Sequence, residues 1–146
     1  MQAADFPAIV QAFLDERQRP VTEQLRQLFA AYPTADHFLF EYLLGLDHAI
    51  LAYARRANDT DLNEDKTLFT GFPDYLTELT AYDQQHGTAL ASELRGDERV
   101  AELLDSWFED CWQAAGGVEL PVPSYYMYEG DSSLFNLQTQ EWQDGL

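Results

Sequence analysis

Residues 34–56, TADHFLFEYLLGLDHAILAYARR, form a long and predominantly apolar stretch. Drawn as an α-helix, the stretch is apolar around most of its circumference. Thr34 is a suitable N-cap, and Arg55 and Arg56 are favourable at the negative C-terminal end of a helix dipole. We therefore predict a helix at the centre of the fold, in contact with neighbours on several sides.

The segments that flank this stretch also show helical spacing. Pro7 suits the first turn of a helix that begins near residue 6, and Pro20 should kink that helix or divide it in two. Pro73 opens a further helix, which ends at Gly87 or, after a break, near Leu94. We therefore place these helices around the central one.

The segment after Asp97 gives the firmest helical pattern. Asp97 is a suitable N-cap, and Gly116 with Gly117 stops the helix. Its apolar residues, which are expected to face the core, are Val100, Leu103, Leu104, Trp107, Phe108 and Cys111. Together the segments predict a mainly α fold, a small bundle of about four to five helices over roughly residues 6–116.

The last part of the chain changes character. Pro121 and Pro123 end the helical pattern, and the strand-like segments SYYMYE (124–129) and SLFNLQ (133–138) flank the turn-like GDSS. We predict a hairpin-like appendage over about residues 122–143, which must lie on the bundle or on a partner because a lone hairpin is barely stable in water. The whole chain, 1–146, is expected to be a single domain.

The charge balance limits the possible partners. The chain has 26 acidic and 8 basic residues, a formal net charge of −18, and an apolar fraction of 46% that supports a folded core. This charge disfavours nucleic acids and anionic membranes and favours a basic protein partner. The single cysteine, the absence of a basic leader and the lack of an apolar run of about 20 residues predict a cytoplasmic protein. The oligomeric state is not predicted.

A metal site is an alternative interpretation. His37, Glu41 and His48 are separated by 4 and 7 residues, which would place them on one face of the central helix, and Asp83 with His86 could face them from the next helix. These residues would make a metal-binding helical enzyme or sensor. Three histidines are few for such a bundle, so we favour structural roles for all five residues and expect no cofactor.

The sequence contains no catalytic motif that would indicate an enzyme. The sequence has no glycine-rich phosphate loop, no paired-cysteine zinc spacing and no Gly-x-Ser-x-Gly elbow. Cys111 follows Glu109 and Asp110, and neighbouring acids raise a thiol pKa instead of activating it. We therefore expect a binding protein without chemistry of its own.

The helix after Asp97 carries an acidic stripe opposite its apolar seam, and no Lys or Arg follows Arg99 in the chain. The stripe consists of Glu98, Glu102, Asp105 and Glu109, at steps of 4, 3 and 4. Aromatic and acidic residues of the same base-free region are Tyr125, Tyr126, Tyr128, Glu129, Asp131 and Trp142. Rigid aromatic rings beside uncompensated carboxylates suit contact with a basic active site. The acidic stripe is also typical of a solvated helix face, and the aromatic rings could equally form the core of the hairpin.

Two segments carry a resemblance to a known class of protein. WFEDCWQAAGG (107–117) and SSLFNLQTQEW (132–142) resemble parts of the small acidic immunity proteins with which bacteria neutralise toxins of interbacterial competition. The resemblance implies a cytosolic inhibitor that binds a cognate toxin and occludes its active site. Because the resemblance includes no diagnostic motif, no contact residues of an immunity family can be assigned to this chain. An acidic secretion chaperone or adaptor for a basic segment remains the other alternative.

Overall fold

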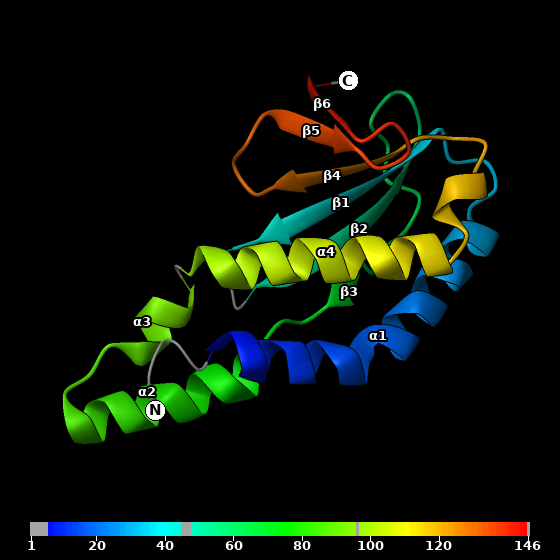
Figure 1. Ribbon diagram of the computed structural model, residues 1–146. Coiled ribbons are helices and arrows are strands. Elements are labelled where there is room, and N and C mark those ends of the chain that lie inside the picture. Colours follow the sequence, from blue (N-terminus) through cyan, green and yellow to red (C-terminus); the bar gives the residue numbers. More distant parts are fainter. Residues whose placement is uncertain (1–5, 45–47, 96, 146) are drawn as a thin grey trace.

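A six-stranded mixed β-sheet is the framework of the protein, which a computed structural model describes over residues 6–44, 48–95 and 97–145 (Figure 1). The helices are α1 (Phe6–Ala31), α2 (Pro73–His86), α3 (Leu90–Arg95), α4 (Glu98–Ala114) and the short 3₁₀ helix η2 (Gly117–Glu119). The strands are β1 (His37–Leu43), β2 (Ala49–Arg55), β3 (Thr67–Phe69), β4 (Ser124–Tyr128), β5 (Ser133–Asn136) and β6 (Glu141–Asp144). The fold is α/β, so the prediction of a mainly α bundle is wrong.

The described residues of the apolar stretch at 34–56, which are 34–44 and 48–56, form two strands and no helix. β1 and β2 pair antiparallel, from His37↔Arg55 to Leu43↔Ala49. Both faces of β1 are buried, so its sequence lacks the alternation of apolar and polar residues that marks a strand with one wet face. An apolar run of this kind is indistinguishable from a buried helix by periodicity alone, and Thr34 caps no helix here.

The C-terminal segment is part of the sheet. β4 and β5 pair antiparallel, which confirms the predicted hairpin, and Gly130 adopts a positive φ of 81° in the turn between them. The description of this hairpin as an appendage is wrong, because β4 also pairs parallel with β1, from Phe38↔Ser124 to Tyr42↔Tyr128. The strand order is β3-β2-β1-β4-β5-β6.

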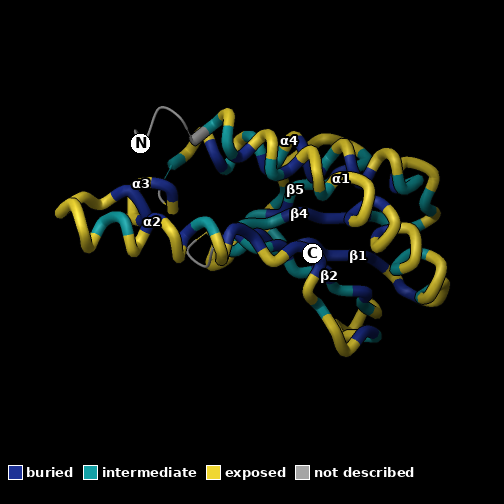
Figure 2. Tube along the Cα trace, turned by 90° about the horizontal axis from the view of Figure 1, so that it is seen from below, coloured by how far each residue is buried: buried dark blue, intermediate teal, exposed yellow. Residues whose placement is uncertain are grey.

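Helices α1 and α4 pack against each other and against one face of the sheet, and Figures 1 and 2 show both helices on the same side. Aromatic pairs join the layers: Phe29 of α1 contacts Phe38 with ring centroids 5.0 Å apart, and Phe108 of α4 contacts Phe40 at 4.9 Å. Helix α1 continues through Pro20, so the proline does not divide it.

The opposite face of the sheet carries a smaller apolar cluster. Leu39, Tyr125 and Leu134 form this cluster, and no residue of the described helices belongs to it. The Arg55 guanidinium lies over the Tyr53 ring, 4.5 Å from its centroid, and covers part of this face. The two faces therefore differ: one is packed under helices, and the other is covered by its own side chains.

The predicted limits of α4 are confirmed. The Asp97 side chain accepts a hydrogen bond from the Arg99 backbone N–H at 2.9 Å, and Gly116 has a φ of +91° just after the helix. The helix has no base in its last turn, but Arg26 of α1 donates to the Ala114 carbonyl at 3.0 Å. A distant residue thus supplies the positive charge that the negative end of this helix favours. No helix among the described residues combines the length and apolar character needed to cross a membrane.

The close approach of Gly117 to Trp112 gives a test of this packing. A Cβ atom at residue 117 would lie 2.1 Å from Cε2 of the buried indole. We expect Gly117→Ala to lower the free energy of unfolding by about 1–3 kcal/mol, because neither group has room to move. Urea titration measures the loss. Val118→Ala, at a neighbouring side chain that is 58% exposed, should change stability little, and equal stability of both variants would contradict this packing.

Candidate functional site

A pocket of about 170 Å³ opens between α4 and the strands β4, β5 and β6. We call it the α4–sheet pocket. Its lining residues are Asp105, Phe108, Glu109, Tyr126, Tyr128, Phe135, Leu137 and Trp142. Two carboxylates therefore face a wall composed mainly of aromatic rings.

Helical and strand periodicity bring these residues together. Asp105 and Glu109 lie one turn apart on α4, so they share one side of that helix. Tyr126 and Tyr128 alternate with Met127 along β4, and both point to the face that α4 covers. Trp142 joins them through strand register, because Tyr126 pairs with Phe135 and Phe135 pairs with Trp142.

Asp105 is the centre of the polar contacts in the pocket. The Tyr126 hydroxyl donates to Asp105 Oδ1 at 2.6 Å, and the Tyr128 hydroxyl donates to Oδ2. Burial raises the pKa of Asp105, the two phenols lower it, and the charge of Glu102 raises it, with a net result above the ordinary value. Ionisation of Asp105 in the folded protein therefore costs more free energy than ionisation of an aspartate in water.

The two phenols remain donors over the whole physiological pH range. Burial raises the pKa of Tyr126 and of Tyr128, and the adjacent Asp105 carboxylate raises both further. A protonated phenol directs its hydrogen toward the carboxylate and leaves its ring as the surface that a ligand would meet. The ring orientation in this wall is therefore set by Asp105.

A second polar contact supports the wall from behind. Tyr42 lies edge-on to Tyr128, with ring centroids 5.5 Å apart, and its hydroxyl bonds Nδ1 of the fully buried His48. The other ring nitrogen, Nε2, lies 3.0 Å from the Leu94 carbonyl. A carbonyl only accepts, so Nε2 carries the proton, and in neutral His48 Nδ1 accepts from Tyr42.

The structure brings together half of the predicted contact residues. The residues Asp105, Glu109, Tyr126, Tyr128 and Trp142 all line the pocket. Others lie elsewhere on the surface: Glu98 and Glu102 are exposed on α4, and Glu129 and Asp131 are exposed at the β4–β5 turn. Tyr125 faces the opposite side of the sheet, in the cluster with Leu39 and Leu134, so it does not join them. Sequence reasoning missed Phe135 and Leu137 and placed Phe108 only in the core.

The residues of the metal alternative are in different surroundings. His37 and Glu41 belong to β1 and not to a helix, and His48 is buried beside Tyr42. Asp83 accepts hydrogen bonds from the Leu90 and Ala91 backbone N–H groups, at 2.9 and 3.0 Å, at the start of α3. The His86 ring contacts the Tyr82 ring at 4.2 Å. Within the described ranges no three His, Cys, Asp or Glu side chains gather as metal ligands, and the shared helical face on which this hypothesis depended does not exist.

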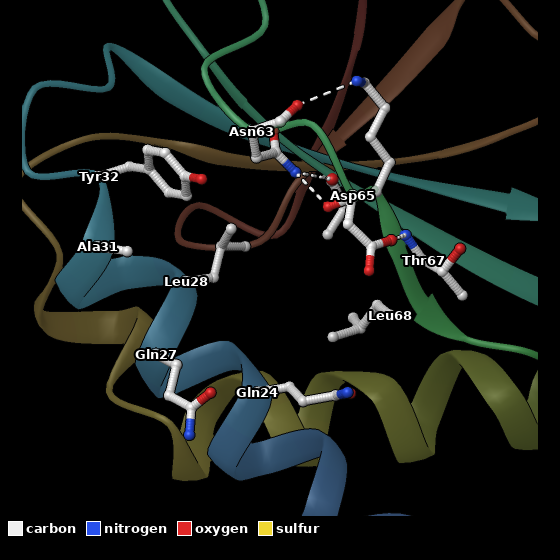
Figure 3. A pocket seen from close by; sticks show the side chains of 11 residues that line it. Gln24, Gln27, Leu28, Ala31, Tyr32, Asn63, Asp65, Thr67 and Leu68 are labelled. Carbon is white, nitrogen blue, oxygen red and sulfur yellow. Dashed lines mark hydrogen bonds between the residues drawn. The ribbon is translucent and has the colours of Figure 1, made fainter.

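A second hollow, of about 230 Å³, lies between the end of α1 and the segment that leads into β3 (Figure 3). Figure 3 shows Tyr32 on one side and Asn63 and Asp65 on the other. The Asn63 amide donates to the Asp65 carbonyl at 3.0 Å, and Lys66 Nζ donates to the Asn63 carbonyl at 3.0 Å. These groups hold the loop together and place both charge signs at the rim, so the α4–sheet pocket is the stronger candidate site.

The raised pKa of Asp105 predicts how stability depends on pH. The folded state holds this proton more tightly than the unfolded chain, so the resulting stabilisation is complete below the ordinary aspartate pKa of about 4 and is lost as the pH rises through the raised value. The Asp105→Asn variant has no titrating group at this position, so it does not lose this stability as the pH rises. We therefore expect the stability of the variant, relative to the parent protein, to increase from about pH 4 to pH 7.

Urea unfolding at several pH values measures this difference. Asp110→Asn is the matched control, because Asp110 is the exposed neighbour of Glu109 on the same helix. The difference in stability between Asp110→Asn and the parent protein should change less with pH. A pH-independent difference between Asp105→Asn and the parent protein would contradict the assignment of a raised pKa to Asp105.

Comparisons of the chain with protein-family models, with curated proteins and with solved structures found no match. The α4–sheet pocket is therefore the basis for a functional proposal.

Proposed function

We propose that this protein is a non-enzymatic binding protein that grips a basic protein partner by a lysine or arginine side chain inserted into the α4–sheet pocket. In the form suggested by the resemblance to immunity proteins, the partner is a toxin enzyme, and binding covers its basic active site. The protein contributes contact and charge, and it catalyses no reaction.

The observation that carries this proposal is a half-buried carboxyl group without a cation. Asp105 receives two phenolic hydrogen bonds, and within the described part of the chain it forms no ion pair. Buried charges in folded proteins are normally paired, because desolvation is costly. A cation from a partner would supply the missing charge and recover the electrostatic cost that raises the Asp105 pKa.

The remaining walls suit the side chain that would bring this cation. Phe135 and the 54% exposed Trp142 offer apolar surface for an aliphatic stem, and long basic side chains bury such stems while their charged heads stay in polar surroundings. The aromatic rings can attract the cation through their π faces. Each oxygen of Asp105 has a further lone pair for a charge-assisted hydrogen bond, and Glu109 adds a second carboxylate.

Charges around the pocket favour rapid encounter with the same partner. Glu98 and Glu102 are exposed on α4, and Glu129 with Asp131 is exposed at the β4–β5 turn. No Lys or Arg follows Arg99 in the chain to cancel their field. Such a field raises the association rate with a basic surface and loses strength as salt screens it.

A general-acid role for Asp105 is less well supported. A raised carboxyl pKa occurs in catalytic acids, but such an acid must reach its substrate in a fixed pose with a partner group. Both oxygens of Asp105 accept from phenols whose own pKa values are raised. The pocket thus holds one carboxyl group in place and offers no activated nucleophile beside it.

Association with the native partner tests the proposal. The partner is first identified by co-expression of this protein with the product of the neighbouring gene, scored as rescue of growth from a toxic product. Asp105→Asn keeps the shape of the side chain and removes its charge. We expect this change to weaken binding at least tenfold, about 1.4 kcal/mol, in calorimetry or surface plasmon resonance.

Asp110→Asn changes the net charge equally at an exposed position on the same helix and is expected to weaken binding less than threefold. Equal effects of the two substitutions would contradict insertion into the pocket. A bound partner that is an exported substrate, and not a toxin that is neutralised, would favour the secretion chaperone or adaptor alternative.

A further inference from the structure

We propose that the basic partner docks by adding an extended segment to the free edge of β6, as a further strand of the sheet, and places a lysine or arginine opposite Trp142 at the mouth of the α4–sheet pocket. This inference builds on the proposed function, because it specifies how the basic side chain is delivered.

Strand β6 has one edge available for pairing. It ends the strand order of the sheet, and its inner edge pairs with β5 from Ser133↔Asp144 to Asn136↔Glu141. No other described strand pairs with its outer edge. An edge strand presents alternate backbone N–H and C=O groups that are unpaired, and an extended peptide gains main-chain hydrogen bonds by adding to them.

The register of the sheet aligns this edge with the pocket. Tyr126 is the partner of Phe135, and Phe135 is the partner of Trp142, so the three rings form a row across β4, β5 and β6. Partners in an antiparallel pair project on the same face. A residue opposite Trp142 on an added strand would continue this row, next to an indole that is already 54% exposed. A long basic side chain at that position is directed to the pocket that Trp142 itself lines.

The negative charge near the β6 edge favours a basic segment as the added strand. Glu141 and Asp144 are exposed on β6, and the adjoining pocket contains Asp105 and Glu109. Like charges directly opposite each other destabilise a strand pair, so a second copy of this chain, with a net charge of −18, is disfavoured. Asp144 projects on the same face as Trp142, toward α4, whereas Glu141 projects on the opposite face with its partner Asn136. A segment with Lys or Arg on the face toward α4 therefore meets opposite charge from Asp144 and from the two carboxylates of the pocket, and Glu141 adds negative charge on the other face of the edge.

The other edge of the sheet is less suited to pairing. β3 has three residues, and its register with β2 shifts between Ile50 and Leu51. A short strand with an irregular register is a common protection of an edge. The regularity of the two edges therefore favours β6 for an added strand.

Nuclear magnetic resonance titration of the isotope-labelled full-length protein tests this docking mode. The probe is an acetylated and amidated peptide of about eight residues, a length sufficient for one strand, in which Thr and Arg alternate. We expect the peptide to shift the Trp142 indole N–H and the β6 amides, and to slow hydrogen exchange at alternate β6 amides. Shifts confined to residues outside β6 would overturn the proposal.

Two control peptides separate strand pairing from simple charge attraction. The fully N-methylated peptide keeps the charge and loses all backbone donors, and we expect it to bind at least fivefold more weakly. A peptide of alternating Thr and Glu should cause no shifts. If the N-methylated peptide binds as well as the parent peptide, strand addition is overturned.

A matched pair of variants locates the contact. Glu141→Lys with Asp144→Lys reverses both acids of β6, and Glu64→Lys with Glu78→Lys makes the same change of net charge at exposed positions outside β6. We expect the first variant to weaken peptide binding at least fivefold and the second less than twofold. Equal weakening would show that the peptide responds to net charge alone and would overturn placement on β6.

The outcome for the native partner separates this inference from the proposed function. Partner binding that depends on Asp105 but not on the acids of β6 would overturn strand addition alone. Partner binding that is insensitive to Asp105→Asn would overturn the proposed function itself.

Discussion

The burial of β1 on both faces is the constraint on which the architecture depends. Phe38, Phe40 and Tyr42 belong to the main core, and Leu39 belongs to the cluster on the opposite face. A strand of this kind must have neighbours on both edges to satisfy its backbone groups. β2 supplies one edge as an antiparallel partner that follows closely in sequence, and β4 supplies the other as a parallel partner, which requires a long crossover. Helices α2, α3 and α4 lie within that crossover.

This crossover positions the candidate site. α4 packs over β1 through the contact of Phe108 with Phe40, and the chain then enters β4 beside β1. Alternation along β4 directs Tyr126 and Tyr128 toward α4 and Tyr125 away from it. The two phenols meet Asp105 on the side of α4 next to its apolar seam. The pocket is therefore a consequence of how the helix and the strand are connected and packed.

The acidic residues of α4 differ in the free energy that their ionisation costs the folded state. Exposed carboxylates such as Glu98 and Glu102 are solvated and screened, so their mutual repulsion is small. Asp105 has lost much of its hydration, and burial is the main cause of its raised pKa. The repulsion at the C-terminal end of the helix is also reduced by Arg26, which contacts the Ala114 carbonyl from α1. Among the carboxyl groups of the stripe, Asp105 therefore has the strongest need of a cation.

The sequence by itself determined the features that depend on neighbours within a turn or two. Helix α4 with its Asp97 cap, the end of α2 at Gly87 and the β4–β5 hairpin follow from capping, left-handed glycines and turn residues. The surplus of acids and the aromatic C-terminal third were likewise evident. These signals include five of the residues that line the pocket.

Only the tertiary structure decided that 37–43 and 49–55 form strands, that β1 pairs with β4, and that Trp142 and Asp105 share one pocket. The apolar run of β1 satisfies a buried helix and a buried strand equally well, because both need apolar surface on all sides. The choice depends on partners in β4 that lie 86 residues further along the chain. Their pairing leaves no local mark in the sequence of β1. The contacts of the α4–sheet pocket arise from that long-range pairing, which is why local patterns identified the residue types of the candidate site but not their arrangement.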